Sequence, residues 1–227
     1  MKSKRNLLEQ LKSLPYFSKD SLYQLGKQLG LADATVDTYI SRFLKHKEIL
    51  QLKKGLYISA DFFSKNRSNI SYSFYLANII RMTSYISSWS ALQFYNLTAE
   101  VIYNITSVTP KVTRSYKTKV GIFTYQSIKE DLFSDFYLTQ GKSVSLVSST
   151  LSAEKSLYGQ LVKLDFYIAS PAKALFDLLY FKTHQFRGVC SKDAKALVEE
   201  LRIDIDEMEK KERTKFYTMI KKYLNDE

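Results

Sequence analysis

The sequence predicts an α+β protein built from two domains. Two short amphipathic helices around a tight turn are followed by a lysine-rich hairpin within residues 18–59. Further on, strand-like runs gather in the middle of the chain and helical patterns flank them, which favours a small, mainly antiparallel sheet in a mixed α+β domain. The net charge of +11 is also uneven, because residues 1–59 hold 11 Lys and Arg against 5 Asp and Glu. We expect an N-terminal domain at 1–60, a polar linker at 61–71 and a C-terminal domain at 72–227.

The first helix of the pair is marked by Ser18, a good N-cap residue, and by leucines at helical spacing (Leu22, Leu25, Leu29). Gly30 follows, where a left-handed C-terminal cap requires a glycine. Upstream, Leu7, Leu8, Leu11 and Leu14 predict a helix that backs this pair.

The second helix is expected to begin at an Asp33 cap and to bury Val36, Ile40, Phe43 and Leu44. Its opposite face is small and polar at the start and basic at the end. That face comprises Ala34, Thr35, Thr38, Ser41, Arg42 and Lys45. Small hydroxyl residues permit close approach to base edges, and arginine can bond guanine in a bidentate manner.

The hairpin is predicted from Ile49–Leu52 and Leu56–Ser59, with Lys53, Lys54 and Gly55 as its turn. Two helices and a hairpin in this order are typical of a winged helix-turn-helix, in which one helix enters the major groove of duplex DNA. Lys53 and Lys54 would then contact phosphates, as would Lys4 and Arg5 in an N-terminal arm. The alternative for the second helix is an ordinary amphipathic helix with a solvated face. For Lys53 and Lys54 it is a solvated turn, and for Lys4 and Arg5 it is a frayed basic terminus.

Composition narrows the class of protein. The 227 residues can form one large or two small cores, and no run approaches the roughly 20 apolar residues of a membrane span. The N-terminus lacks the apolar segment of a signal peptide. Cys190 is the single cysteine, which predicts neither a disulfide framework nor a thiolate metal cluster and suits the cytoplasm. The positive charge predicts a nucleic-acid partner and no membrane partner.

The rest of the chain predicts helices and strands in alternating groups. Helices are expected from Tyr72 to Ile80, from Ser87 or Ser88 to Tyr95, after the cap formed by Ser170 and Pro171, and in two C-terminal segments around Leu197 and Ile220. Strands are expected at Val101–Val108, Val120–Ile128, Val144–Ser148 and Val162–Ile168.

Catalytic constellations are few. Ser90 is not between the glycines of a nucleophile elbow, and His46 and His184 are the only histidines. Asp165 and Asp177 could hold Mg²⁺ as a pair, although acids at that spacing are usually solvated or paired with lysines. We therefore expect no catalytic residues, no metal and no cofactor.

Three segments, taken with the hairpin ending KKGLYIS, resemble the AbiEi family of type IV antitoxins and transcriptional regulators. They are SSWSALQFYNL at Ser87–Leu97, VTPK at Val108–Lys111 and ASPAKALFD at Ala169–Asp177. The resemblance spans nearly the whole chain, in the family's order. Two departures stand out, since Ala172 replaces an acidic residue of the family pattern and the stretch 138–159 looks longer than the family's loop.

The resemblance implies a protein that binds inverted repeats in its own promoter and represses its operon. It implies a C-terminal domain that counteracts a nucleotidyltransferase-like toxin encoded next door, without forming a stable complex with it. Lys111, Arg114 and Lys117 are candidates for a second basic surface, the alternative being a solvated strand edge. Two other functions remain open: a mobile-element transcription regulator without a toxin, and a nucleic-acid-processing enzyme.

Overall fold

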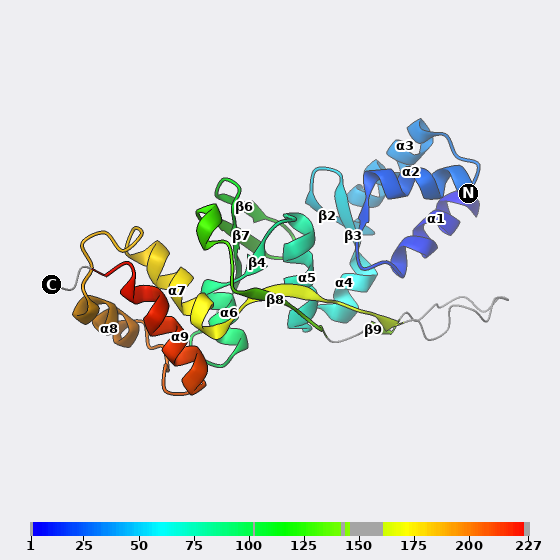
Figure 1. The fold of residues 1–227 in the computed structure, drawn as a ribbon. Coiled ribbons are helices and arrows are strands. Elements are labelled where there is room, and N and C mark those ends of the chain that lie inside the picture. The colour runs from blue at the N-terminus through cyan, green and yellow to red at the C-terminus, as the bar shows by residue number, and fades with distance from the viewer. Residues whose placement is uncertain (1, 102, 142–143, 146–160, 225–227) are drawn as a thin grey trace. The chain divides into compact units, whose positions relative to one another are not determined.

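The computed structural model describes residues 2–101, 103–141, 144–145 and 161–224 (Figure 1), and of residues 2–5, 144–145 and 161 it describes the backbone alone. Its contacts divide the chain into two compact units. Unit 1 comprises Met1–Ile80, Tyr116–Gly121 and Gln140–Asp165, and unit 2 comprises Arg81–Ser115, Ile122–Thr139 and Phe166–Glu227. Each unit has its own sheet and helices. The chain is therefore an α+β protein with a small antiparallel sheet and a larger mixed sheet.

Unit 1 begins with a run of helices and short strands. Their order is α1 (Lys2–Lys12), β1 (Phe17–Ser18), α2 (Lys19–Gln28), α3 (Asp33–Lys45), β2 (Ile49–Lys53) and β3 (Leu56–Ser59). The strands form an antiparallel sheet in the order β1-β3-β2. A second, two-stranded sheet joins β9 (Val144–Ser145) to β10 (Leu161–Val162).

Local signals account for these elements. The Ser18 hydroxyl accepts a hydrogen bond from the Ser21 amide at 3.0 Å, which confirms the predicted N-cap of α2. Gly30 (φ +70°) and Gly55 (φ +77°) take the left-handed conformation that their turns require. The predicted Asp33 cap is wrong by one residue: Ala32 is the N-cap of α3, and Asp33 is the first residue of the helix, where its charge favours the positive end of the dipole.

The core of unit 1 is apolar and continuous across its helices and sheet. It comprises Leu7, Leu11, Phe17, Leu22, Val36, Ile40, Phe43, Ile49 and Tyr57. Gly26 sets the approach of α2 to α3, because a Cβ at this position would collide with Cγ2 of Val36. The missing side chain thus fixes how closely the two helices pack.

Where the sequence favoured a linker at 61–71, the structure has α4 (Ala60–Asn66) and the start of α5 (Ile70–Ile80). The composition of this stretch is polar, but it contributes one apolar side chain to the core. Phe62 is 4% exposed, and its ring lies 5.3 Å from the Tyr72 ring. Tyr72 in turn donates to the Pro15 carbonyl at 2.6 Å, so α4 and α5 pack against the rest of unit 1.

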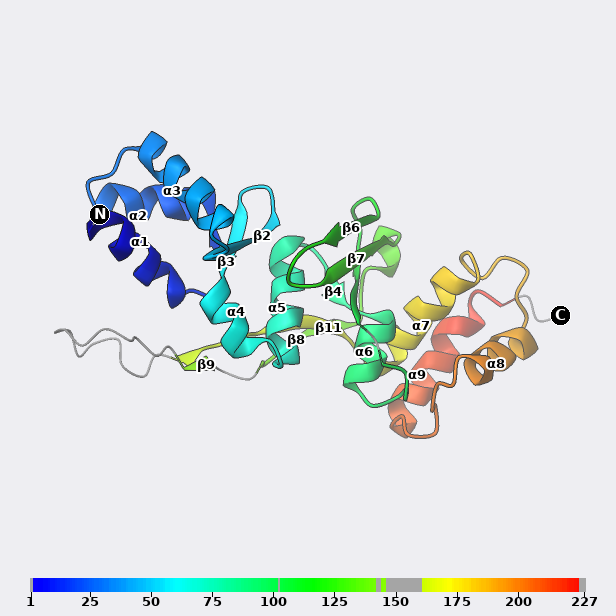
Figure 2. The same ribbon diagram turned by 180° about the vertical axis from the view of Figure 1, so that it is seen from behind.

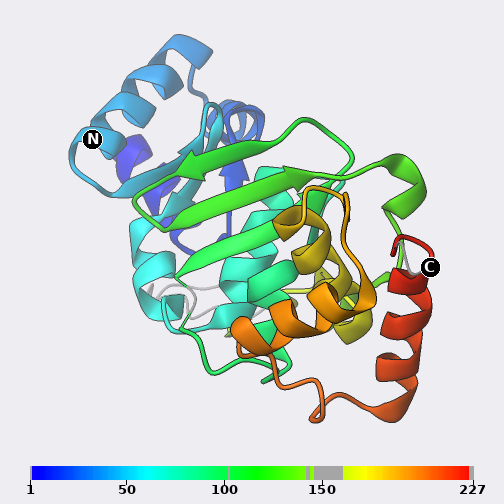
Figure 3. The ribbon, with the colours of Figure 1, turned by 90° about the vertical axis from the view of Figure 1, so that its left-hand side faces the viewer.

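Unit 2 contains a six-stranded sheet in the order β6-β7-β5-β4-β11-β8, and Figure 3 shows its green strands from the side. Its strands are β4 (Tyr85–Ile86), β5 (Asn104–Thr109), β6 (Arg114–Lys117), β7 (Ile122–Ser127), β8 (Phe136–Thr139) and β11 (Phe166–Ala169). Parallel pairs join β5 to β7 and β4 to β11, whereas β4–β5 and β8–β11 are antiparallel. The expected small, mainly antiparallel sheet is thus larger and mixed, because β6 takes the edge and β7 returns to lie along β5.

Helices complete unit 2. They are α6 (Ser88–Phe94), α7 (Pro171–Lys182), α8 (Ser191–Glu200) and α9 (Lys210–Lys221), with a 3-10 turn at Glu130–Leu132. Figure 2 shows α7, α8 and α9 together near the C-terminus. Ser170 accepts from the Lys173 amide and Pro171 is the first helical residue, as the sequence predicted for α7. None of the described helices is long and apolar enough to cross a membrane.

Candidate nucleic-acid interface

Helix α3 has one buried and one exposed face. Val36, Ile40 and Phe43 are at most 6% exposed and belong to the core. The predicted polar face lies on the other side, where Thr38, Ser41, Arg42 and Lys45 are exposed and Thr35 is half-buried. The Thr38 hydroxyl donates to the Ala34 carbonyl at 3.0 Å, which leaves its oxygen free to accept.

The basic end of this face carries charge that no described side chain neutralises. Neither Arg42 nor Lys45 forms an ion pair with any side chain that the structure describes. Both lie in the last turn of α3, where a cation also complements the helix dipole. The guanidinium and the ammonium are therefore available to an external anion.

Asp37, the acid nearest to this face, is engaged by α2. Its carboxylate accepts from the Tyr23 hydroxyl at 3.0 and 3.1 Å and pairs with the Lys19 ammonium at 2.9 Å. The hydrogen bond that the Lys19 ammonium donates to Asp37 holds the pKa of Asp37 below its usual value, and the hydrogen bonds that this ammonium donates to Tyr23 and Asp37 raise the pKa of Lys19. This acid therefore stays ionised and paired, which weakens its repulsion of a phosphate backbone.

Sequence reasoning missed this cluster of Lys19, Tyr23 and Asp37. A signal existed on α2, since Lys19 and Tyr23 are four residues apart and share a helix face. The Lys19 ammonium lies 5.1 Å from the centre of the Tyr23 ring. The partner on α3 is far along the chain, and only the packing of the two helices brings it within reach.

Lys19 also connects α2 to the hairpin. Its backbone amide donates to the Gly55 carbonyl at 2.9 Å, at the tip of the β2–β3 turn. One residue thus contacts the hairpin through its main chain and α3 through its side chain. This arrangement fixes the separation between the exposed face of α3 and the hairpin tip.

The two lysines of the hairpin differ. Lys53 is half-buried at the end of β2. Its ammonium donates to the carbonyl of Ile80, the last residue of α5, at 2.5 Å. Lys54 is exposed in the turn. Only Lys54 projects its charge from the hairpin tip, whereas Lys53 anchors the hairpin to α5.

The other predicted basic residues belong to both units. Lys117 lies in the part of the β6–β7 hairpin that belongs to unit 1 and, with its neighbour Lys119, lines a hollow beside β2 together with Leu44 and Gln51. Lys111 and Arg114 belong to unit 2 and are exposed. Lys4 and Arg5 lie in the first turns of α1, and their side chains lie outside the described part of the structure.

The ASPAKALFD segment places a buried ion pair in unit 2. Lys173 is 1% exposed and pairs with Asp177, which is fully buried. Asp177 also accepts from the Ser87 hydroxyl at 2.6 Å and the Tyr85 hydroxyl at 3.0 Å. Burial raises the pKa of Asp177, and the Lys173 ammonium opposes the shift.

These contacts occupy both carboxylate oxygens of Asp177, one of the two acids considered for Mg²⁺. The other, Asp165, belongs to unit 1 and is half-buried. Among the described residues, no group of three or more His, Cys, Asp and Glu side chains is arranged to hold a metal ion.

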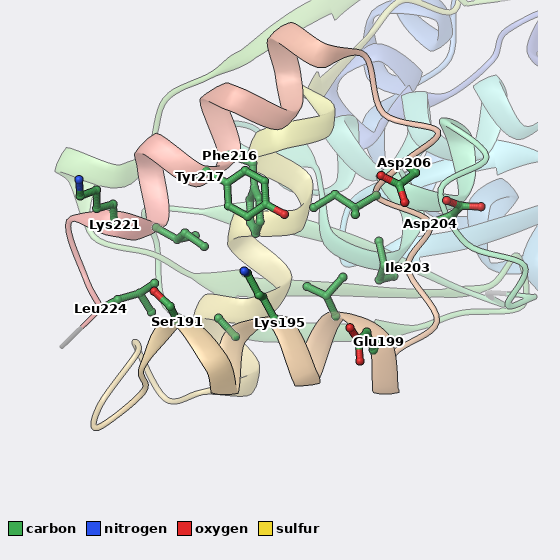
Figure 4. A pocket seen from close by; sticks show the side chains of 14 residues that line it. Ser191, Lys195, Glu199, Ile203, Asp204, Asp206, Phe216, Tyr217, Lys221 and Leu224 are labelled. Atoms are coloured by element: carbon green, nitrogen blue, oxygen red, sulfur yellow. The ribbon is translucent and has the colours of Figure 1, made fainter. Parts of the chain in front are cut away.

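A hollow of about 610 Å³ lies between α8 and α9 (Figure 4). Its apolar floor is formed by side chains that are already covered, since Val198, Phe216 and Ile220 are at most 7% exposed. Lys195, Glu199 and Lys221 stand at its rim. The hollow therefore offers little uncovered apolar area to a ligand, and the α3 face is the stronger candidate.

No protein-family model matches this chain, and no curated protein matches it. The exposed face of α3 and the hairpin tip are therefore a candidate site on their geometry alone. Helix α3 offers hydroxyl acceptors, one guanidinium and one ammonium on a face that is free of unpaired carboxylate, and the hairpin tip adds a second exposed ammonium.

Proposed function

We propose that the chain is a sequence-specific duplex-DNA-binding protein that represses its own operon, and that unit 1 is a winged helix-turn-helix. One observation carries the proposal: α1, β1, α2, α3, β2 and β3 follow in this order, and α3 turns a polar, basic face outward. In that fold the second helix of the pair enters the major groove, and the hairpin that follows contacts the backbone.

The chemistry of α3 suits base reading. Arg42 is suited to a bidentate contact with guanine, and the small Thr38 and Ser41 let the helix lie close to base edges. Lys45 and Lys54 supply phosphate contacts, which position the helix without carrying sequence information. Two copies of the chain bind the two halves of an inverted repeat.

The biological role rests on the resemblance to the AbiEi family. On the basis of this resemblance, the chain is the antitoxin of a type IV toxin–antitoxin operon. Its C-terminal domain counteracts a nucleotidyltransferase-like toxin, and the antitoxin and the toxin form no stable complex. The buried pair of Lys173 and Asp177 supports a structural role for the ASPAKALFD segment, because Asp177 ties α7 to Tyr85 of β4 and to Ser87, the N-cap of α6.

The alternative is a mobile-element regulator without a toxin, and the gene downstream discriminates between the two. A nucleotidyltransferase-like gene there supports the antitoxin. An enzyme that processes nucleic acid is the third proposal. It predicts a thermal shift that depends on a divalent metal and a loss of that shift when Asp165 is changed.

The test of the proposed function uses the full chain and the DNA upstream of its own coding sequence. We expect a gel-shift titration to give tighter binding to this DNA than to a scrambled duplex of the same length and composition. A reporter fused to the same promoter should be repressed by the wild type and not by Arg42→Ala. Equal binding to both duplexes would refute sequence-specific recognition.

Co-expression with the downstream gene tests the second role. If repression and toxin neutralisation are separate, Arg42→Ala restores growth as the wild type does while failing to repress. Rescue lost together with repression would show that lowering toxin expression is the whole effect.

A further inference from the structure

Arg81 is a buried cation without a matching acid. It follows α5, is 9% exposed, and forms no ion pair with any described side chain. One terminal nitrogen donates to the Val112 carbonyl at 2.6 Å, and its Nε has no hydrogen-bond partner. Buried charges in proteins are normally paired, and a buried donor without a partner calls for an explanation.

The loop after β5 brings a second cation close to the backbone beside Arg81. Lys111 is exposed, and its ammonium lies 3.5 Å from the carbonyl oxygen of Met82, the residue that follows Arg81. Thr109 reinforces this contact between the loops by donating to the Thr83 carbonyl at 2.8 Å. The guanidinium and the ammonium are thus held by two cross-linked loops at one end of the sheet.

The surrounding sequence is poor in acids. From residue 81 to residue 129 there are 6 Lys and Arg but a single acid, Glu100. The Arg81 guanidinium lies over the ring of Tyr125, 5.9 Å from its centre. Its neighbour on this side is therefore an aromatic ring and not a carboxylate. An aromatic ring attracts a cation but carries no net charge to neutralise it.

We propose that Arg81 and Lys111 form a phosphate-binding site in unit 2, separate from the α3 face. A guanidinium with an uncommitted terminal N–H and a neighbouring ammonium suit a phosphate, since the arginine can donate to one oxygen and the lysine adds a point charge. The phosphate belongs either to a nucleic-acid backbone or to a free nucleotide. The site does not depend on the DNA-reading role of α3.

The test measures binding of inorganic phosphate to the full chain by isothermal titration calorimetry, with chloride at equal ionic strength as the reference. We expect Lys111→Gln and Arg81→Met each to weaken phosphate binding by roughly tenfold or more, the loss typical of one hydrogen bond to a charged group. Lys129→Gln is the matched control, because it removes an exposed lysine of the same unit. It should bind phosphate as the wild type does.

Lys111 is exposed, so its variant folds even if Arg81→Met does not. Competition then identifies the source of the phosphate: displacement by ATP assigns a free nucleotide, and displacement by a short duplex in the Arg42→Ala background assigns a nucleic-acid backbone. Phosphate binding that Lys111→Gln leaves unchanged would overturn the site. Phosphate binding that neither ATP nor the duplex displaces would also overturn the site, because it would indicate an adventitious ion only.

Discussion

The two hairpin lysines should behave differently although they are adjacent. Sequence alone gives Lys53 and Lys54 the same role as phosphate contacts. The structure ties the Lys53 ammonium to the Ile80 carbonyl at 2.5 Å and leaves Lys54 exposed in the turn. The informative perturbation is to change each to alanine separately in the full chain.

The magnitudes follow from these environments. Lys53→Ala removes a hydrogen bond from a charged, half-buried donor, which is worth roughly 1.5–3 kcal/mol of stability. Lys54→Ala removes an exposed side chain and should change stability by no more than about 0.5 kcal/mol. In DNA binding the order reverses: loss of one phosphate contact lowers the slope of log K against log salt by about 0.9.

Two assays on each variant decide the matter. Urea unfolding gives the free energy of unfolding, and fluorescence anisotropy with duplex DNA at several salt concentrations gives the slope. We expect Lys53→Ala to lose stability with most of its slope kept, and Lys54→Ala to keep stability and lose slope. Equal losses of slope in the two variants would refute the anchoring role of Lys53.

Three further changes extend the account. Arg42→Ala should weaken operator binding by roughly 1–3 kcal/mol in gel-shift titrations and relax base preference, whereas Arg67→Ala, an exposed arginine at the end of α4, should leave preference intact. Lys173→Met strands the buried Asp177 carboxylate and should cost about 3–5 kcal/mol in urea unfolding; a cost below about 1 kcal/mol would contradict the ion pair. Because Lys19 holds the pKa of Asp37 below its usual 3.8, their pair stabilises the fold above that pH. The difference in melting temperature between wild type and Asp37→Asn should therefore shrink as pH falls below 3.8, and a difference that persists there would argue against the pair.

The α2–α3 pair was predictable because its signals are local. A capping serine, an apolar spacing and a glycine in a left-handed turn each act within a few residues, and Ser18, Gly30 and Gly55 all hold the predicted conformations. The exposed face of α3 follows from the same periodicity. Only the exact cap was misplaced, since Asp33 lies one residue inside the helix.

The sheet of unit 2 was harder to predict because its pairing is not local. Strand β4 has two residues and β6 is mostly polar, so neither carries a strand pattern of its own. The parallel pairing of β5 with β7 arises from the path of the chain around β6. Helix α4 was missed for another reason: its polar composition concealed the buried Phe62.

The same distinction applies to the candidate sites. Arg42 and Lys54 were found as exposed basic residues of a helix and a turn. The partners of Lys53 and Asp37 lie 27 and 18 residues away along the chain, at Ile80 and Lys19, and become visible only after folding. Arg81 could not be found from its sequence context, because its significance lies in burial without an acid.

The most direct test of the central proposal is a footprint of the full chain on the DNA upstream of its own coding sequence. We predict protection of an inverted repeat whose half-sites are separated by about one helical turn or a multiple of it. Arg42→Ala should lose this protection at protein concentrations where the wild type is saturated. Uniform, salt-sensitive protection without a preferred site, unchanged in Arg42→Ala, would contradict sequence-specific reading by α3.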